Sequence, residues 1–413
     1  MARDMTTQSI DRAETGAAGE LPTLGVVSAA HLVSHLHIMV LPVLMHLLRD
    51  RVHAGYFELG LAITAFSVVS GLTQAPMGVL VDRIGGRVVL VAGMLLGGAA
   101  FASLAVLDSY AWLIAAAVLA GLANCVYHPA DYAILNCAIS EGRMGRAFSV
   151  HTFAGFAGGA IAPPLLLGVA AWAGVGASFI AAGACAWAVA ALVLLVPAAP
   201  GSAGVRPPAA LAAASAVKGS LREVLTPTVL VLALFFTLLG LSGAAMSTFA
   251  IAALIAGHGV SSAAATTALT AYLVASAVGV LAGGLVADRT SRHGDVAAAG
   301  FGVSALLALA IAVAPLPVPV LVAAMGLTGF LFGIVQPARD MLVRKAAPPD
   351  ATGRVFGIVS TGFNIGGIIG PALLGFLMDQ GLPRWTFGSA VVFMLATATL
   401  GLLEERRARL PRG

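Results

Sequence analysis

Residues 145–166 read GRAFSVHTFAGFAGGAIAPPLL, and residues 353–374 read GRVFGIVSTGFNIGGIIGPALL. The two stretches align without a gap when the chain is shifted by 208 residues. Shared alanine or leucine would mean little in so apolar a chain, whereas shared glycine, proline and arginine are informative. The pattern indicates an internal repeat, with each half of the chain forming one unit. The nine identities are Gly145/Gly353, Arg146/Arg354, Phe148/Phe356, Gly158/Gly366, Gly159/Gly367, Ile161/Ile369, Pro163/Pro371, Leu165/Leu373 and Leu166/Leu374.

The repeat extends beyond this stretch. The same shift pairs Gly121 with Gly329 and Pro129 with Pro337. A shift of 206 residues pairs a second set, which consists of Gly78/Gly284, Asp82/Asp288 and Arg83/Arg289. The two halves therefore correspond over most of their length.

The composition places the chain in a membrane. Of its 413 residues, 59% are hydrophobic and only 10% are charged, whereas soluble domains carry about 25% charged residues. So little charge excludes a surface covered by water. Apolar stretches long enough to cross a bilayer are predicted at about 23–48, 56–80, 88–107, 111–138, 147–172, 176–197, 226–256, 262–286, 295–313, 318–343, 353–379 and 385–404.

Basic residues orient the predicted spans. Arginine and lysine gather in alternate loops and in both terminal segments, which predicts that these parts and both termini are cytoplasmic. We predict an all-α integral membrane protein of twelve transmembrane helices, in two six-helix bundles related by a pseudo-twofold axis along the membrane normal. The predicted parts are a cytoplasmic N-terminal tail (1–22), the N-terminal bundle (23–197), a cytoplasmic linker (198–224), the C-terminal bundle (225–405) and a basic cytoplasmic tail (406–413).

Ionisable residues inside the spans of the first half are candidates for function, because each is costly to insert into a bilayer. His31 and His35 share one face of the first span, since they are four residues apart. Histidine titrates near neutral pH, so this pair could carry a transported proton. The alternative is that each histidine is neutral and hydrogen-bonded to a neighbouring helix. Further candidates for the same cavity are Asn124, Tyr127, His128 and Asp131 in the fourth span, and His151 and Thr152 in the fifth.

The second half supplies a different set of candidates for the cavity. Arg339 is the only arginine or lysine well inside a predicted span, and its planar guanidinium suits a carboxylate or phosphonate. Its alternative role is a local pair with Asp340. Gln336 in the same span and Asn364 in the eleventh are weaker candidates. Arg339 and the histidines favour an anionic or zwitterionic solute.

No group of residues predicts catalysis. The sequence has neither a nucleotide-binding glycine loop nor a metal-spaced cluster of histidine and cysteine in a loop. We therefore predict that the chain is no enzyme, binds no cofactor, metal or nucleic acid, and works as a monomer in the lipid bilayer. Its expected partners are a small organic solute and protons.

The stretch Gly78-Val79-Leu80-Val81-Asp82-Arg83-Ile84-Gly85-Gly86-Arg87 resembles the signature loop of the major facilitator superfamily, and it lies between spans two and three, as in that family. The degenerate copy at 284–289 fits the same pattern. The resemblance implies an alternating-access transporter in which Asp82 latches the two halves together on the cytoplasmic side. The gating residues it implies are Gly78, Asp82, Arg83, Gly85, Arg87, Arg146, Asp288, Arg289 and Arg354.

Shorter motifs resemble the fosmidomycin-resistance type of exporter within that superfamily. They are His31-Leu32, Leu41-Pro42, Glu58-Leu59-Gly60-Leu61, Gln74, Pro76 and Tyr127-His128-Pro129. This resemblance implies proton-coupled export of a drug or metabolite across a bacterial inner membrane. The region from Ala117 to Gly121 lacks the arginine of drug–proton antiporters, so import of a carboxylate-like nutrient by proton symport stays open. A transport-inactive sensor or scaffold on the same fold is the third alternative.

Overall fold

The computed structural model describes residues 2–106, 108–197, 225–346 and 352–409, and within these ranges the chain is helical with no strand. Twelve helical segments of this described part are long and apolar enough to cross a membrane. The prediction of an all-α protein with twelve spans is therefore confirmed.

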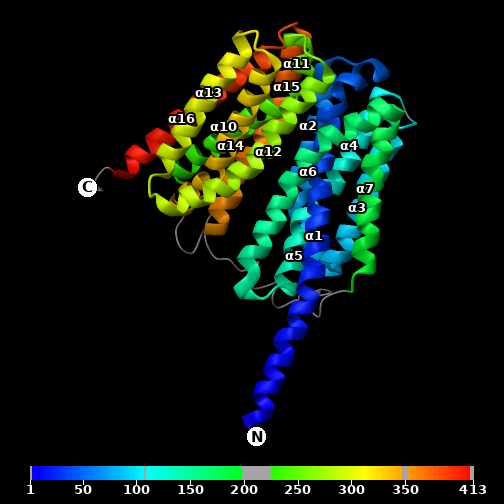
Figure 1. Cartoon of the computed structure of the whole chain (residues 1–413), viewed down its shortest axis with the longest axis vertical. Helices are drawn as coiled ribbons and strands as arrows, with labels where there is room; N and C mark the ends of the chain where they lie inside the picture. Colours follow the sequence, from blue (N-terminus) through cyan, green and yellow to red (C-terminus); the bar gives the residue numbers. More distant parts are fainter. Residues whose placement is uncertain (1, 107, 198–224, 347–351, 410–413) are drawn as a thin grey trace.

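Each half of the chain contributes six of these spans. The first half consists of α1 (Ala2–Val52), α2 (Tyr56–Ile84), α3 (Gly86–Ser103), α4 (Tyr110–Asn124), α5 (Tyr127–Ala138), the short 3-10 helix η1 (Glu141–Arg143), α6 (Met144–Ala173) and α7 (Val175–Leu195). The second half consists of α10 (Pro227–Ser247), α11 (Ala250–His258), α12 (Ser262–Arg289), α13 (His293–Val313), α14 (Val318–Ala346), α15 (Thr352–Asp379) and α16 (Trp385–Arg409). Figure 1 shows the halves as two helix bundles lying side by side.

Repeated glycines bring corresponding helices into close contact in both bundles. A Cβ atom on Gly158 would lie 1.9 Å from the carbonyl oxygen of Leu32, and one on Gly366 would lie 2.7 Å from that of Thr237. Only glycine permits α6 to approach α1, and α15 to approach α10, this closely. These two glycines form one of the pairs that revealed the repeat.

Two spans are broken. The fourth consists of α4 and α5, and the break at Cys125 and Val126 lies just before Pro129. Proline has no N–H to donate to the carbonyl group four residues earlier, which is that of Cys125, so the predicted interruption is explained. The seventh span is broken between α10 and α11, at Thr248 and Phe249. No proline or glycine lies at that point, so the sequence did not predict this break.

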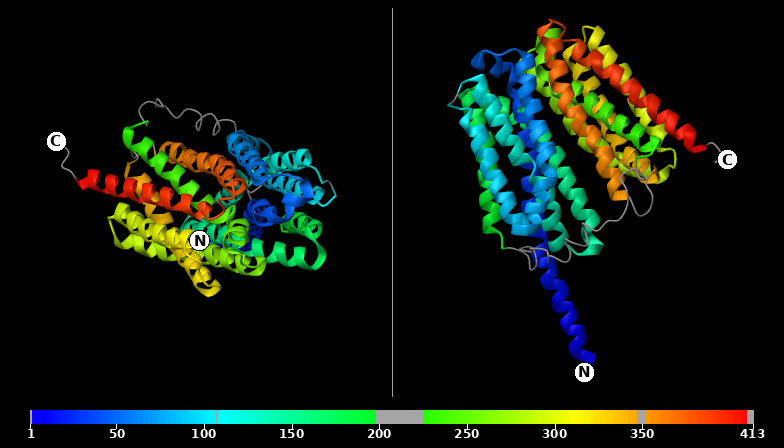
Figure 2. Two further views of the ribbon diagram at one scale, coloured as in Figure 1. Left: turned by 90° about the horizontal axis from the view of Figure 1, so that it is seen from above. Right: turned by 180° about the vertical axis from the view of Figure 1, so that it is seen from behind.

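The two bundles diverge towards one end. We call the end that carries Arg83, Arg87 and Arg143 the basic end, and the opposite end the far end. Between α2 and α15, a Cβ on Gly60 would lie 2.3 Å from the carbonyl oxygen of Pro371, whereas one on Gly71 would lie 3.8 Å from Asn364. Figures 1 and 2 show the same arrangement, with the bundles in contact at the far end and apart at the basic end.

The predicted N-terminal tail, linker and C-terminal tail can be compared with the described helices. Helix α1 runs unbroken from Ala2 into the first span, so residues 2–22 continue that helix. The predicted linker at 198–224 lies outside the described residues. Helix α16 extends to Arg409, which leaves the last four residues of the predicted basic tail outside the description.

Candidate substrate and coupling site

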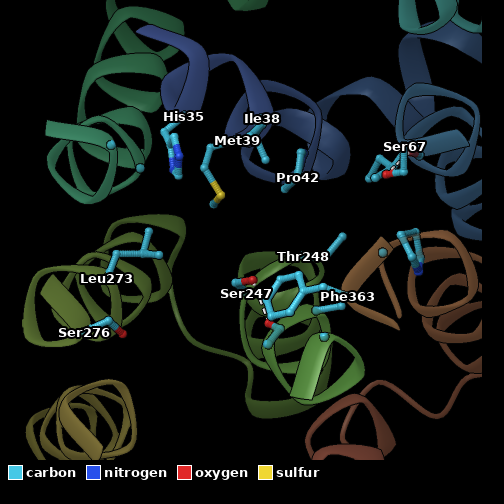
Figure 3. A pocket seen from close by; sticks show the side chains of 18 of the residues that line it. His35, Ile38, Met39, Pro42, Ser67, Ser247, Thr248, Leu273, Ser276 and Phe363 are labelled. Atoms are coloured by element: carbon cyan, nitrogen blue, oxygen red, sulfur yellow. Dashed lines mark hydrogen bonds between the residues drawn. The ribbon is translucent and has the colours of Figure 1, made fainter. Parts of the chain in front are cut away.

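A cavity of about 340 Å³ lies between the two bundles. This volume is within the range of pockets that hold a small organic molecule. The first half contributes residues of α1, α2 and α6, and the second half contributes residues of α10, α12, α14 and α15. Most of the lining is apolar or aromatic, and Figure 3 shows His35, Ser67, Ser247 and Ser276 as polar groups around it.

A cluster of ionisable side chains adjoins this cavity in the first half. The Oδ2 atom of Asp131 lies 3.6 Å from Nδ1 of His31 and 3.5 Å from Nε2 of His151. The ring of His31 is 3.9 Å from that of His151, 4.7 Å from that of His35 and 5.2 Å from that of His128, measured between centroids. We call these five residues the His–Asp cluster. His35 belongs to the cluster and also lines the cavity.

Local structure explains how the cluster forms. His31 and His35 stack one turn apart on α1, and Asp131 lies in the second turn of α5, after the break before Pro129. Gly155 lets α6 approach the two histidines of α1. A Cβ at this position would lie 2.7 Å from Nε2 of His31 and 2.9 Å from Nε2 of His35.

Three members of the cluster, His31, Asp131 and His151, are buried and carry polar atoms that lack partners within the described structure. Asp131 is 0% exposed, His151 is 1% exposed and His31 is 5% exposed. Among the described residues, both carboxylate oxygens of Asp131, both ring nitrogens of His151 and Nδ1 of His31 have no hydrogen-bond partner. A buried polar atom left unsatisfied costs about 1–3 kcal/mol. The arrangement thus leaves lone pairs available to a proton.

The same spacing would also admit a metal ion. One nitrogen of each of His31 and His151 and one oxygen of Asp131 lie within 4.8 Å of one another. Nitrogen and oxygen ligands of this kind suit divalent transition metals. The cluster can therefore be considered as a proton site or as a cation site, and the two are distinguished by experiment below.

The other sequence candidates of the first half lie around the cluster in different ways. Asn124 donates a hydrogen bond of 2.9 Å to Oγ of Ser70, which joins α4 to α2. Tyr127 is buried, and within the described structure its hydroxyl has no partner. Thr152 is exposed on α6 and is not among the residues that line the cavity.

The candidates of the second half do not line the cavity. Arg339 donates a 3.0 Å hydrogen bond from Nε to Oδ1 of Asp340, and its guanidinium packs 4.8 Å from the ring centre of Phe236 and 5.4 Å from that of Phe363. Gln336 donates to the carbonyl oxygen of Phe332 at 3.3 Å. Asn364 is exposed on α15 and faces Gly71 of α2.

The residues of the signature loop lie at the basic end. Gly85 has φ 92° in the turn between α2 and α3, a conformation that glycine adopts readily. Arg87 donates to the carbonyl groups of Val193, Leu194 and Val196 at the end of α7. The side chain of Arg354 lies outside the described residues. Within the described part of the chain, no hydrogen bond or ion pair links the halves through Gly78, Asp82, Arg83, Arg146, Asp288 or Arg289.

Comparisons with known proteins agree with this architecture. Two crystal structures of a bacterial homologue of the human lysosomal transporter Spinster match it, both in an inward-facing conformation, one unoccupied and one occupied. Their TM-scores are 0.78 and 0.77 at 15% and 14% sequence identity, over 95% and 94% of this chain and 98% of each of theirs. Such low identity shows a shared fold alone.

Sequence comparisons extend this result. The fosmidomycin resistance protein of Escherichia coli (strain K12) is 27% identical over 142 residues, which are 34% of this chain and 35% of that protein. The match thus spans about a third of either chain. The family model described as Major Facilitator Superfamily matches residues 27–255 and again residues 235–412, one match for each repeat. The chain therefore belongs to the Major Facilitator Superfamily, a family of membrane transporters and not of enzymes.

Proposed function

We propose that this transporter exports a small organic solute by alternating access and is driven by the proton gradient. The observation that carries the proposal is the His–Asp cluster, a group of proton-binding side chains with a buried centre, next to a cavity between the two bundles. A carboxylate and two imidazoles at 3.5–3.6 Å can share one proton and pass it on. His35 connects this group to the solute, because it belongs to both the cluster and the cavity lining.

The lining of the cavity suggests the kind of solute. Aromatic rings of Phe66, Phe156, Tyr272, Phe332 and Phe363 border it, with a few hydroxyl groups and His35. Such a surface binds an apolar or aromatic body by burial and orients it through a small number of polar contacts. The anionic solute expected from Arg339 finds less support, because that side chain is paired with Asp340 and lies outside the lining.

Orientation and direction complete the proposal. By the positive-inside rule the basic end faces the cytoplasm of a bacterial cell, with both termini on that side of the inner membrane. The cavity is then open to the cytoplasm when the bundles are apart at the basic end. Export agrees with the similarity to the fosmidomycin resistance protein. We further propose that a single chain is sufficient, since the cavity is built from its own two halves.

Transport by purified protein in proteoliposomes tests the proposal. With a pH gradient imposed, a dye reports internal pH while candidate amphipathic solutes are added one at a time. We expect solute-dependent proton flux in the wild type and in His37→Gln, because His37 bonds to Ala182 within its own bundle. We expect a flux about two orders of magnitude lower in Asp131→Asn. A metal chelator should leave the flux unchanged; loss of flux on chelation would show that the cluster works as a metal site instead.

The same assay distinguishes the alternatives. An inward flow of solute together with protons would indicate symport rather than export. Flux that depends on sodium and ignores the pH gradient would refute proton coupling. A sensor or scaffold would be favoured by two results together. The purified protein would show no flux of any solute, and the Asp131→Asn variant would still restore the growth phenotype of cells that lack the protein.

A further inference from the structure

Helix α15 reaches across to the other bundle at the far end. Its last residue, Asp379, accepts hydrogen bonds from the backbone N–H groups of Tyr56 at 2.9 Å and Phe57 at 2.7 Å. These two N–H groups open α2, where the first turn has no partners within its own helix. A carboxylate is favoured there by the free N–H groups and by the helix dipole. The contact joins the two halves of the transporter.

Helix α2 depends on this carboxylate because it has no cap of its own. Its N-cap residue is Gly55, which has no side chain to accept a hydrogen bond. The corresponding helix of the second repeat, α12, is capped by the residue 206 positions later, Ser261, whose Oγ accepts from the N–H of Ala264 at 3.2 Å. The residue that corresponds to Asp379, 208 positions earlier, is Ala171. The α6–α12 contact between the halves therefore lacks an equivalent acid.

The packing around this contact requires the two helices to lie close together. A Cβ on Gly375 would lie 2.3 Å from the carbonyl oxygen of Tyr56. The first turn of α2 is also fixed to its own bundle, because Tyr110 donates from its hydroxyl to the carbonyl oxygen of Glu58 at 3.1 Å. Asp379 consequently binds a rigid target, and the bundles cannot separate at the far end without breaking both hydrogen bonds.

The opposite end of the same helix pair also carries an acid, but there the acid has no partner in the described part of the chain. Asp82 lies near the end of α2, on the side where α15 begins, and within the described residues it makes no hydrogen bond or ion pair. A Cβ on Gly78 or Gly357 would meet nothing within 4 Å. Each of the two antiparallel helices thus carries an acid at or near its C-terminal end. Of these two acids, only Asp379 has hydrogen-bond partners among the described residues.

We propose that Asp379 is the latch that holds the far end closed while the basic end is open. This inference rests on the proposed alternating-access function. Asp379 binds the start of α2 in this state and must release it before the far end can open. The residue positions the two bundles relative to each other and is not among the residues that line the cavity. Loss of its two charge-assisted hydrogen bonds should shift the equilibrium towards the far-end-open state by about tenfold.

Distance measurements between spin labels test the latch without any solute. Labels at Val106 and Leu382, exposed at the far end of each half, are placed in a chain whose three cysteines are replaced. We expect Asp379→Ala to increase the population with the longer distance about tenfold, and Asp379→Asn, which keeps one acceptor oxygen, to give a smaller increase. The matched control is Asp108→Ala, which removes another far-end acid whose partner, Arg51, belongs to the same half. This control should leave the distances unchanged.

A double variant separates the latch from simple helix capping. Gly55→Ser in the Asp379→Ala background is designed to give α2 its own cap, as Ser261 does for α12, without creating a contact between the halves. The added Cβ would lie 2.6 Å from Oε2 of Glu58, which is the end of a flexible side chain and can rotate away. We expect it to restore thermal stability and not the short distance. Three results would each overturn the latch. The first is unchanged distances in Asp379→Ala, the second is an equal change in Asp108→Ala, and the third is a full return of the short distance in the double variant. Because no transport is measured, a failed transport assay would count against the proposed function and not against this result.

Discussion

Asp131 in α5 and Arg339 in α14 occupy the same position of the two repeats, 208 residues apart, yet their surroundings are opposite. Asp131 is fully buried, and its carboxylate oxygens have no hydrogen-bond partner among the described residues. Arg339 is paired with Asp340 and covered by two phenylalanine rings. At this repeat position the first half holds an unsatisfied ionisable group, and the second half holds a satisfied one.

Neighbouring positions of the repeat follow the same division. His128 corresponds to Gln336, and His151 corresponds to Val359, which is fully buried. By contrast, Gly158 and Gly366, and likewise Gly121 and Gly329, are kept and permit equivalent close helix contacts. Packing residues have thus been retained in both halves, whereas the ionisable residues inside these spans have diverged. The difference teaches that the fold is twofold, whereas the proposed proton site has no counterpart in the second half.

The largest expected effect is that of Asp131→Asn. Asparagine keeps the size of the side chain but cannot take up or release a proton in the working pH range. We expect coupled transport to fall by about two orders of magnitude, the scale of losing an essential proton-transfer group, with little change in thermal unfolding. Proton flux in proteoliposomes measures it. Retention of more than about a tenth of the flux would place the coupling group elsewhere.

The next effect in size is that of Gly155→Ala. The added methyl group would lie 2.7 Å from Nε2 of His31, so the rings must move and the cluster is distorted. We expect slower coupled transport and a loss of stability of about 1–3 kcal/mol, the usual cost of overpacking. Thermal unfolding in detergent measures the loss of stability, and proton flux in proteoliposomes measures the slower transport.

Gly159→Ala is the matched control for that variant, one turn further along α6. A Cβ there would meet nothing within 4 Å, and alanine favours a helix more than glycine does. Because Gly159 lines the cavity, the comparison uses stability and the number of protons moved per solute. We expect the stability to be equal or slightly higher and the number of protons per solute to be unchanged. Equal losses in both variants would mean that α6 tolerates no added volume at all, and the special role of Gly155 would be lost.

A smaller effect is expected for Arg339→Gln. The sequence alone favours a large loss of solute binding, because Arg339 is the only intramembrane arginine. The structure favours a small one, since Arg339 does not line the cavity and its removal leaves Asp340 with half of its side chain exposed to solvent. We expect the solute Kd to change less than about threefold, the scale of losing a partly exposed ion pair, as measured by ligand-induced thermal stabilisation. A loss of more than about tenfold would restore Arg339 as a solute-binding residue.

The sequence predicted the architecture well because the relevant signals are local or repeated. Apolar length gives the spans, and shared glycines and prolines give the twofold arrangement of the bundles. Helical spacing alone places His31 beside His35, and Pro129 alone predicts the break in the fourth span. Each of these inferences needs only the chain near the residue concerned.

The remaining features depend on contacts between helices, which spacing along the chain does not determine. Asn124 shares a helical face with Asp131, yet it pairs with Ser70 of α2. Arg339 pairs with the adjacent Asp340, although adjacent residues on a helix point in different directions. Gly155 and Asp379 were not singled out, because the importance of each lies in a neighbour from another helix. A scan for glycines opposite intramembrane histidines, or for acids at helix C-termini, could have found them.

The smallest effect is expected from exchanging the repeat-related residues His128 and Gln336. His128→Gln removes an exposed imidazole 5.2 Å from the ring of His31, and it should lower the rate of coupled transport. Gln336→His adds an imidazole to the second half, where the amide of Gln336 only donates to the carbonyl oxygen of Phe332. An imidazole N–H can replace that donor, and neither an aspartate corresponding to Asp131 nor a histidine corresponding to His151 is present to complete a second cluster. We therefore expect Gln336→His to leave both the transport rate and the number of protons moved per solute unchanged, as measured by parallel dye and solute-flux traces. If this variant moved additional protons per solute, one added histidine would be enough to form a coupling site in the second half. The difference in proton binding between the halves would then depend on a single side chain and not on a whole cluster.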